Sequence, residues 1–283
     1  MALLGLPVVL IAGWFLIMGS LRGDLREGEA AIAAGRPDLA EAAFRRALTR
    51  DPNNERAMYG IGWAWHMAGE EDEAREAFSL LAEVHPDSPL GYKGIGSVWM
   101  AQGNAKEARA SFEVALAKAG DGPDALKIED SLALLALSGR DGAAALAAFD
   151  ALLLRDADRA EFHWGRAEAL LLLNRGEEAM TEADEAVRCA EGTGARLQGM
   201  ALITRARTLL EVSGGRVDAA SCVQTAPPVY AWLAQADRDL DQAQALGMDL
   251  PSIQGVRRTV LDRRGKVDDA CPGQRPLRMP EAP

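Results

Sequence analysis

The chain has 283 residues, of which 48% are hydrophobic and 5% aromatic, and its formal net charge is −11. This hydrophobic content can build a core, so the composition excludes a largely disordered protein. The negative charge argues against a broad nucleic-acid-binding surface, which requires clustered Lys and Arg. Alanine and leucine are abundant whereas Val, Ile and Thr are scattered, and this balance favours helices over sheets.

The first predicted element is a transmembrane helix over residues 2–21. No charged side chain occurs before Arg22, and a helix of this length spans about 30 Å, the thickness of a bilayer's hydrocarbon core. The segment lacks the basic start and the cleavage site of a secretory signal peptide, so residues 1–21 are interpreted as an uncleaved anchor. We therefore expect a single-pass inner (cytoplasmic) membrane protein with the lipid bilayer as one partner.

The side of the membrane stays open at this stage. Arg22 and Arg26 follow the span, and by the positive-inside rule they lean toward a cytoplasmic body. Cys222 and Cys271 favour the other side, since a disulfide between them would imply an oxidising compartment. Their pairing depends on a Cα–Cα distance that sequence does not reveal. We expect a periplasmic (extracytoplasmic) body, with a cytoplasmic one as the alternative.

Residues 22–122 contain a repeat with a period of 34. An alanine is followed by a phenylalanine four residues later and by an apolar residue three beyond, which places the three side chains on one helical face. This triplet occurs as Ala40/Phe44/Ala47, Ala74/Phe78/Leu81 and Ala108/Phe112/Ala115, with a fourth copy at Ala145/Phe149/Leu152.

A second helix is predicted before each triplet. Its pattern is Met58, Ile61, Gly62 and Trp65 in one copy and Tyr92, Ile95, Gly96 and Trp99 in the next. The period and both patterns closely resemble the tetratricopeptide (TPR) repeat. The glycine pairs in these helices are therefore not a dinucleotide-binding loop, which needs a third glycine and a preceding strand. We interpret Gly62 and Gly96 as positions where two helices approach closely.

The resemblance implies an all-α, right-handed helical solenoid of five to six helix pairs. The predicted organisation is an anchor at 1–21, a TPR array at 22–246, a capping helix at 247–268 and a tail at 269–283. The repeats are placed near 22–54, 55–88, 89–122, 125–159 and 160–193, followed by a degenerate pair at 195–246. A long loop at 213–228 interrupts this last pair.

Little in the sequence indicates catalysis. His66, His85 and His163 have no partner at metal-ligand spacing, so we expect no metal site and no cofactor. No nucleophile elbow or P-loop occurs. We expect a protein that is not an enzyme; an enzyme or sensor would need a site in the 213–228 loop.

Protein binding is the function that the resemblance implies. In TPR arrays the first helices line a concave groove, and the matching positions here are Tyr59, Trp63, His66, Met67, Lys93, Ser97, Met100, Asp130, Leu134, Trp164 and Glu168. Tyr59 and Trp63 share a helical face and are equally compatible with gripping an apolar peptide or with core packing. Capture of a C-terminal carboxylate is not expected, because Trp63, Ser97 and Leu134 stand where the family uses Lys or Asn.

We therefore expect a membrane-anchored scaffold or assembly factor, similar to bacterial envelope TPR proteins, that binds other proteins and no small-molecule substrate. The alternative is a permanent structural subunit of an integral membrane complex, held through its transmembrane helix by the small residues Gly5, Ala12 and Gly19. The basic last helix is interpreted as a solvated cap rather than a contact for an acidic partner, because acids alternate with its arginines. The partner's identity and the oligomeric state stay open.

Overall fold

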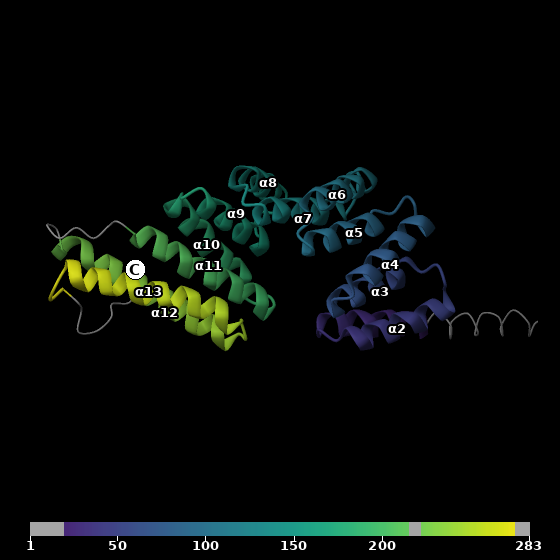
Figure 1. Ribbon diagram of the computed structural model, residues 1–283, viewed down its shortest axis with the longest axis horizontal. Helices are drawn as coiled ribbons and strands as arrows, with labels where there is room; N and C mark the ends of the chain where they lie inside the picture. Colours follow the sequence, from purple (N-terminus) through teal and green to yellow (C-terminus); the bar gives the residue numbers. More distant parts are fainter. Residues whose placement is uncertain (1–19, 215–221, 275–283) are drawn as a thin grey trace, which may run out of the picture. The chain divides into compact units, whose positions relative to one another are not determined.

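The computed structural model describes residues 20–214 and 222–274, and its regular elements in these ranges are all α-helices (Figure 1). A first helix covers residues 20–33. The helices that follow are α2 (Pro37–Arg50), α3 (Glu55–Ala68), α4 (Glu71–Val84), α5 (Leu90–Ala101), α6 (Ala105–Ala119), α7 (Ala125–Ser138), α8 (Gly142–Arg155), α9 (Ala160–Leu172), α10 (Gly176–Ala190), α11 (Ala195–Ser213), α12 (Cys222–Ala245) and α13 (Leu250–Ala270).

These helices form two compact units, which we describe separately. Unit 1 extends to Leu135 and unit 2 begins at Ala136, so the boundary lies within α7. In unit 1, each of α2 to α5 packs against the next helix along the chain. In unit 2 the same holds from α8 to α13, and α11 also contacts α9 and α13. Packing between successive helices confirms the predicted all-α helical solenoid.

In each of the first five helix pairs, the turn between the two helices occurs at a residue with a left-handed backbone. Gly69 ends α3 with φ 82°, and its amide donates to the carbonyl of His66 at 3.1 Å. Four further turns have a positive φ at the corresponding position: Gly35, Gly103, Arg140 and Asn174. Side chains other than asparagine rarely adopt this conformation. The later repeats therefore keep the turn geometry at Arg140 although the glycine is lost.

The core of unit 1 contains one phenylalanine per repeat. Phe78 is fully buried, and its ring lies between Gly62 of α3 and Gly94 of α5. A Cβ atom added at Gly62 would come within 2.5 Å of the ring, and one at Gly94 within 2.3 Å. Other phenylalanines contact glycines in the same way: Phe44 with Gly28 and Gly60, Phe112 with Gly96, and in unit 2 Phe149 with Gly165. The glycines thus provide the space that these rings occupy.

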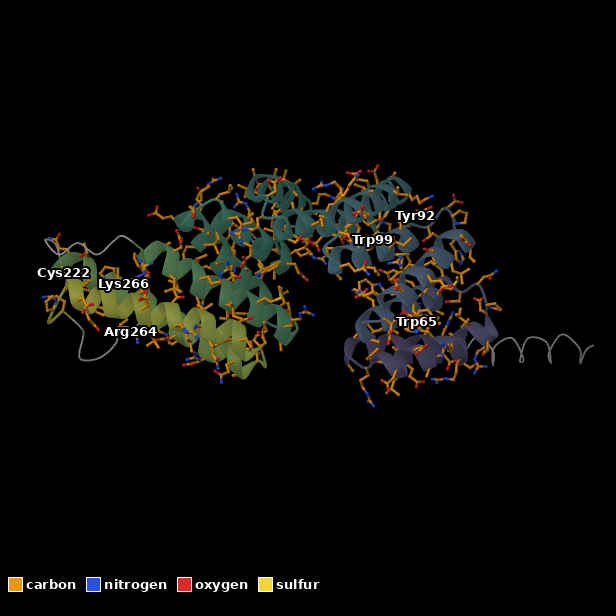
Figure 2. All side chains as sticks on the ribbon, viewed as in Figure 1. Trp65, Tyr92, Trp99, Cys222, Arg264 and Lys266 are labelled. Carbon is orange, nitrogen blue, oxygen red and sulfur yellow. A yellow bond between two sulfur atoms is a disulfide. The ribbon has the colours of Figure 1, made fainter. Side chains whose placement is uncertain are left out.

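In the fifth repeat the buried face of the second helix, α10, consists of smaller side chains. Ala179, Ala183 and Ala186 of α10 stand where earlier repeats have Ala, Phe and Ala, and all three are fully buried. Two tryptophans pack at the edge of the core. Trp65 and Trp99, both labelled in Figure 2, are half-buried against the cores of their repeats.

The last helix pair differs from its predicted boundaries. The sequence predicts its second helix at 227–246, beginning with two prolines, whereas α12 begins at Cys222 and contains Pro227 and Pro228 in its interior. Tertiary contacts hold this first part helical, because Ala226 is fully buried and Cys222 is covalently attached elsewhere. Most of the predicted loop at 213–228 is therefore helix or, at 215–221, outside the described residues.

Cys222 and Cys271 form a disulfide bond that joins the start of α12 to the end of α13. Their Cα atoms are 5.4 Å apart, a distance usual for such bridges. Cys222 is labelled at one end of unit 2 in Figure 2. Cys189 is a free, half-buried thiol whose pKa is raised by burial.

The expectation of a single-pass inner-membrane protein requires correction. Among residues 20–214 and 222–274, none of the helices combines the length and the apolar character needed to cross a bilayer. The helix at 20–33 carries Arg22, Asp24 and three further charged side chains, and each charge at a bilayer centre costs about 2.5–3.5 kcal/mol. Leu21, the end of the predicted span, packs in the core of the first repeat. Residues 2–19 of that span lie outside the described residues.

Candidate functional site

The first helices of the pairs in unit 1 enclose a pocket of about 340 Å³. We call it the N-terminal pocket. Three groups of residues line it: Glu29, Ile32 and Phe44 from the first helix pair, Arg56, Tyr59, Gly60 and Trp63 from α3, and Leu90, Asp124 and Lys127 from the following repeats. Most of its exposed lining is apolar, and the charged groups stand around that apolar surface.

Two aromatic side chains of α3 form one wall of the pocket. The rings of Tyr59 and Trp63 meet edge to face, with centroids 6.0 Å apart. Both rings also pack on the buried ring of Phe78, at 5.6 Å for Tyr59 and 6.1 Å for Trp63. Tyr59 and Trp63 therefore line the pocket and pack on the core at the same time. Their contacts with Phe78 fix the position of the pocket wall.

The hydroxyl group of Tyr59 keeps its proton over the whole physiological range. Burial raises the pKa of Tyr59 to about 12, although a hydrogen bond with Trp63 lowers it, and the carboxylate of Asp124 adds to the increase. A neutral phenol offers both a donor and an acceptor. The wall thus presents a polar, uncharged group within an otherwise apolar surface.

Two ion pairs lie at the rim of the pocket. Arg56 donates from Nη2 to Oε1 of Glu29 at 2.5 Å, and Lys127 approaches Oδ1 of Asp124 at 3.3 Å. Three of the four side chains are exposed and Asp124 is half-buried, so each pair stabilises the fold by about 1 kcal/mol or less. Such pairs can exchange partners at low cost when a charged ligand arrives.

Lys93 and Ser97 lie on α5, where the sequence places them in the groove. Burial lowers the pKa of Lys93, and Lys127 lowers it further, whereas Asp124 and Asp130 raise it. Ser97 is buried and donates its hydroxyl hydrogen to the carbonyl of Lys93 at 3.0 Å. Ser97 therefore uses its hydrogen within the helix, while Lys93 belongs to the charge cluster beside the pocket.

The other predicted groove residues of unit 1 lie outside the pocket lining. Nδ1 of His66 is 2.8 Å from Oε2 of Glu71, across the turn between α3 and α4. Met67 is exposed at the end of α3, and Met100 packs against the core that contains Phe112. Asp130 is half-buried on α7.

Trp164 lies in unit 2 and is part of a separate set of contacts. Its indole nitrogen donates to Oγ1 of Thr204 at 3.0 Å, and that hydroxyl donates to Oε1 of Glu168 at 2.6 Å. Trp164 thereby links α9 to α11. Its place among the binding residues stays a prediction.

Eight lining residues were absent from the predicted groove: Glu29, Ile32, Phe44, Arg56, Gly60, Leu90, Asp124 and Lys127. Arg56 and Leu90 occupy the second position of their repeats, which the TPR pattern includes among groove positions, so that pattern contained the signal. Asp124 lies in the connection between α6 and α7, and Lys127 lies in the first turn of α7. Only the folded chain brings these two residues to α3. In the part of the chain that the structure describes, no three His, Cys, Asp or Glu side chains are grouped to hold a metal ion.

Several solved structures share this fold. A chain of the APC/C hetero-tetramer Cut9–Hcn1 superposes with a TM-score of 0.65 at 16% identity, covering 85% of this chain and 43% of that one. PilW, described as a widely conserved type IV pilus biogenesis factor, gives 0.61 at 17% identity, with 81% and 98% covered. PilF of Pseudomonas aeruginosa gives 0.58 at 16% identity, with 88% and 99% covered. At these identities the likeness concerns the fold alone.

No curated protein matches the sequence at a significant level. A family model described as tetratricopeptide repeat matches residues 25–89, 72–123 and 131–193. These segments cover more than half of the chain and coincide with the helix pairs of the first five repeats. The chain therefore belongs to the tetratricopeptide repeat family.

Proposed function

We propose that this protein is a scaffold or assembly factor that holds a segment of a partner protein in the N-terminal pocket. The TPR fold is typical of proteins that bind other proteins or peptides. The observation that carries the proposal is the apolar pocket walled by Tyr59 and Trp63. Burial of one large apolar side chain in it would contribute about 1.5–3 kcal/mol.

The chemistry of the lining supports binding rather than catalysis. Tyr59 has a pKa of about 12, and the charged groups Arg56 and Lys127 are engaged in ion pairs. A general base needs a pKa near the working pH and a reacting group within reach. We therefore propose a non-enzymatic role. The likeness of the fold to PilW, a pilus biogenesis factor, supports assembly as the kind of process served.

Co-purification of matched variants tests the proposal. Trp63→Ala removes the indole from the pocket wall, and Trp99→Ala removes an indole that lies outside the pocket and stacks under Arg75 at 4.8 Å. The tagged full-length chain and both variants are purified from the native host, and the accompanying proteins are quantified by mass spectrometry. A partner should be reduced about 30-fold with Trp63→Ala, as for an interface residue worth about 2 kcal/mol, and retained with Trp99→Ala.

Two results would contradict the proposal. Equal loss of the partner from both variants would assign the tryptophan to fold stability alone. The absence of any protein that accompanies the wild-type chain in stoichiometric amount would also count against a scaffold.

A further inference from the structure

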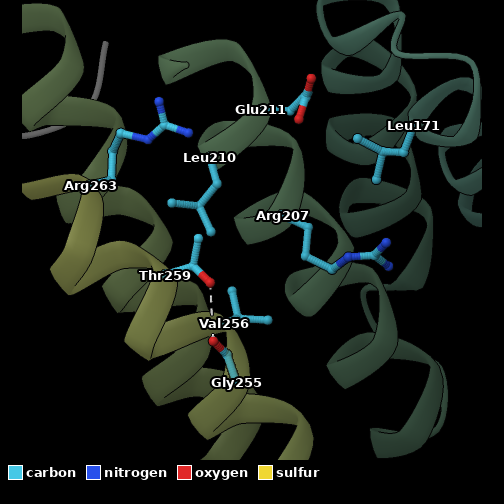
Figure 3. A pocket seen from close by; sticks show the side chains of 8 residues that line it. All are labelled: Leu171, Arg207, Leu210, Glu211, Gly255, Val256, Thr259 and Arg263. Carbon is cyan, nitrogen blue, oxygen red and sulfur yellow. Dashed lines mark hydrogen bonds between the residues drawn. The ribbon is translucent and has the colours of Figure 1, made fainter. Parts of the chain in front are cut away.

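Unit 2 contains a second pocket of about 340 Å³, between α9, α11 and α13 (Figure 3). We call it the C-terminal pocket. Its centre is apolar, with Leu210 of α11 facing Val256 of α13 and Leu171 of α9 to one side. Arg207 and Arg263 stand on opposite sides of Leu210 and Val256 (Figure 3). The pocket thus places an apolar surface between two cations, in a chain whose net charge is −11.

The two arginines differ in how they are paired. Arg207 donates from Nη1 to both carboxylate oxygens of Glu168, at 2.6 and 2.7 Å. Arg263 has no hydrogen bond or ion pair within residues 20–214 and 222–274, although it is half-buried. Its guanidinium group lies beside Gly214, where α11 ends. Within the described residues, Arg263 is therefore the cation of this pocket that no acid neutralises.

Three of the five basic residues of α13 form ion pairs, two with acids of α12 and one with an acid of α13 itself. Asp241 pairs with Arg257 at 2.5 Å, Asp237 with Arg264 at 2.6 Å, and Asp262 with Lys266 at 2.8 Å. These pairs agree with the interpretation of a solvated cap for most of the helix. Arg263, which faces the pocket, is not included in them.

The remaining charge in the lining is Glu211. Its side-chain carbons lie against the first residue of α10, Gly176, where the helix dipole stabilises a carboxylate. In Figure 3 it is separated from Arg263 by the width of the pocket. The Arg263 side thus keeps a positive character.

Gly255 leaves one wall of the pocket bare. It lies within α13, and a Cβ atom added there would meet nothing within 4 Å. A glycine inside a helix costs about 1 kcal/mol relative to alanine. A larger side chain at this position should therefore fill part of the pocket without disturbing the fold.

We propose that the C-terminal pocket binds an acidic segment of a partner protein, with an aliphatic side chain over Leu210 and Val256 and a carboxylate on Arg263. Charge complementarity selects the acidic partner, and the apolar centre selects the aliphatic side chain. This site is independent of the N-terminal pocket and of the function proposed for it.

Fluorescence anisotropy with a defined probe tests this inference on the full chain. The probe is a short labelled peptide of alternating leucine and aspartate with both ends blocked, and its control has asparagine in place of aspartate. The acidic peptide should bind about fivefold more tightly, which corresponds to one partly exposed ion pair. Arg263→Gln should abolish this difference, and Gly255→Leu should abolish the binding of both peptides.

Two variants on the same helix provide matched controls. Gly265 is also a glycine of α13 with nothing within 4 Å of an added Cβ, and Arg258 is an exposed arginine outside the pocket. Gly265→Leu and Arg258→Gln should bind both peptides as the wild type does. Thermal denaturation of all four variants checks that each is folded.

Three results would overturn the inference. These are equal affinity for the two peptides, binding unaffected by Gly255→Leu, and no saturable binding up to about 1 mM, the weakest affinity of interest. Loss of binding in Trp63→Ala would place the peptide in the N-terminal pocket. That outcome would reject this inference and leave the proposed function standing.

Discussion

Phe78 shows how single residues determine the packing of unit 1. Its ring is fully buried between Gly62 and Gly94, and neither glycine has room for a methyl group. The same ring supports Tyr59 and Trp63 in the wall of the N-terminal pocket. The position of this wall therefore depends on Gly62 and Gly94, which leave room for the ring of Phe78.

At this scale we predict the effect of a single methyl group. Gly62→Ala should lower the free energy of unfolding by about 1–3 kcal/mol, because overpacking of a rigid ring outweighs the gain in helix propensity. The control, Gly265→Ala, places its methyl group in open space and should raise stability by up to about 1 kcal/mol. Urea denaturation followed by circular dichroism measures both. Stabilisation by Gly62→Ala would contradict the tight contact.

At the scale of elements, α9 and α10 are joined by a charged network around His163. Nδ1 of His163 lies 2.8 Å from Oε2 of Glu182, and Nε2 lies 2.8 Å from the carbonyl oxygen of Ala157. Both ring nitrogens face acceptors, so the doubly protonated ring fits best. The hydrogen bond with Glu182 is the main cause that raises the pKa of His163, and burial opposes it.

This network predicts a pH-dependent coupling of the two helices. Because the folded pKa lies above the unfolded value of about 6.5, the stabilisation is complete below that pH and is lost as pH rises through the folded pKa. His163→Gln should therefore lower the free energy of unfolding more at about pH 6 than at about pH 9. Chemical denaturation at several pH values measures the difference, with Glu182→Gln as the control that should remove it. A pH-independent effect of His163→Gln would disprove the coupling.

At the scale of the whole molecule, each unit is built from helices that pack on their neighbours along the chain. Solenoids of this kind leave their end helices with a single neighbouring layer, so the ends need additional stabilisation. In unit 2 the end is closed covalently, since Cys222 and Cys271 connect α12 to α13. Ion pairs from α13 to α12 reinforce the same contact.

We predict that the stability of unit 2 depends on the redox state of the disulfide between Cys222 and Cys271. Replacing both Cys222 and Cys271 by serine should lower stability by about 2–4 kcal/mol, because the unfolded chain is no longer constrained by the bridge. Thermal unfolding with and without reductant measures this. Reductant should lower the Tm of the wild type and of the control Cys189→Ser, and should leave the double variant unchanged. An unchanged wild-type Tm on reduction would show that the bridge contributes nothing to the cap.

Much of the fold could be predicted because the repeat is encoded locally. The triplet with Phe78 and its copies places one helical face in the core, and Gly35, Gly69 and Gly103 mark the turns. The site was harder to predict, because its lining joins α3 to Asp124 and Lys127 across more than one repeat. The start of α12 was also missed, since burial of Ala226 and the disulfide override the local rule that prolines end helices.

The sequence by itself determined that this protein is a TPR solenoid, since helical period, turn glycines and core phenylalanines are all short-range patterns. The tertiary structure alone decided which side chains meet: Tyr59 and Trp63 with Phe78, Arg263 with the edge of an apolar pocket, and Cys222 with Cys271. It also decided that Leu21 packs in the core of the first repeat rather than ending a membrane span. The physical reason is that hydrophobicity and charge along a chain indicate whether a residue is buried or exposed. Which residues far apart in sequence come into contact is decided only when the chain folds.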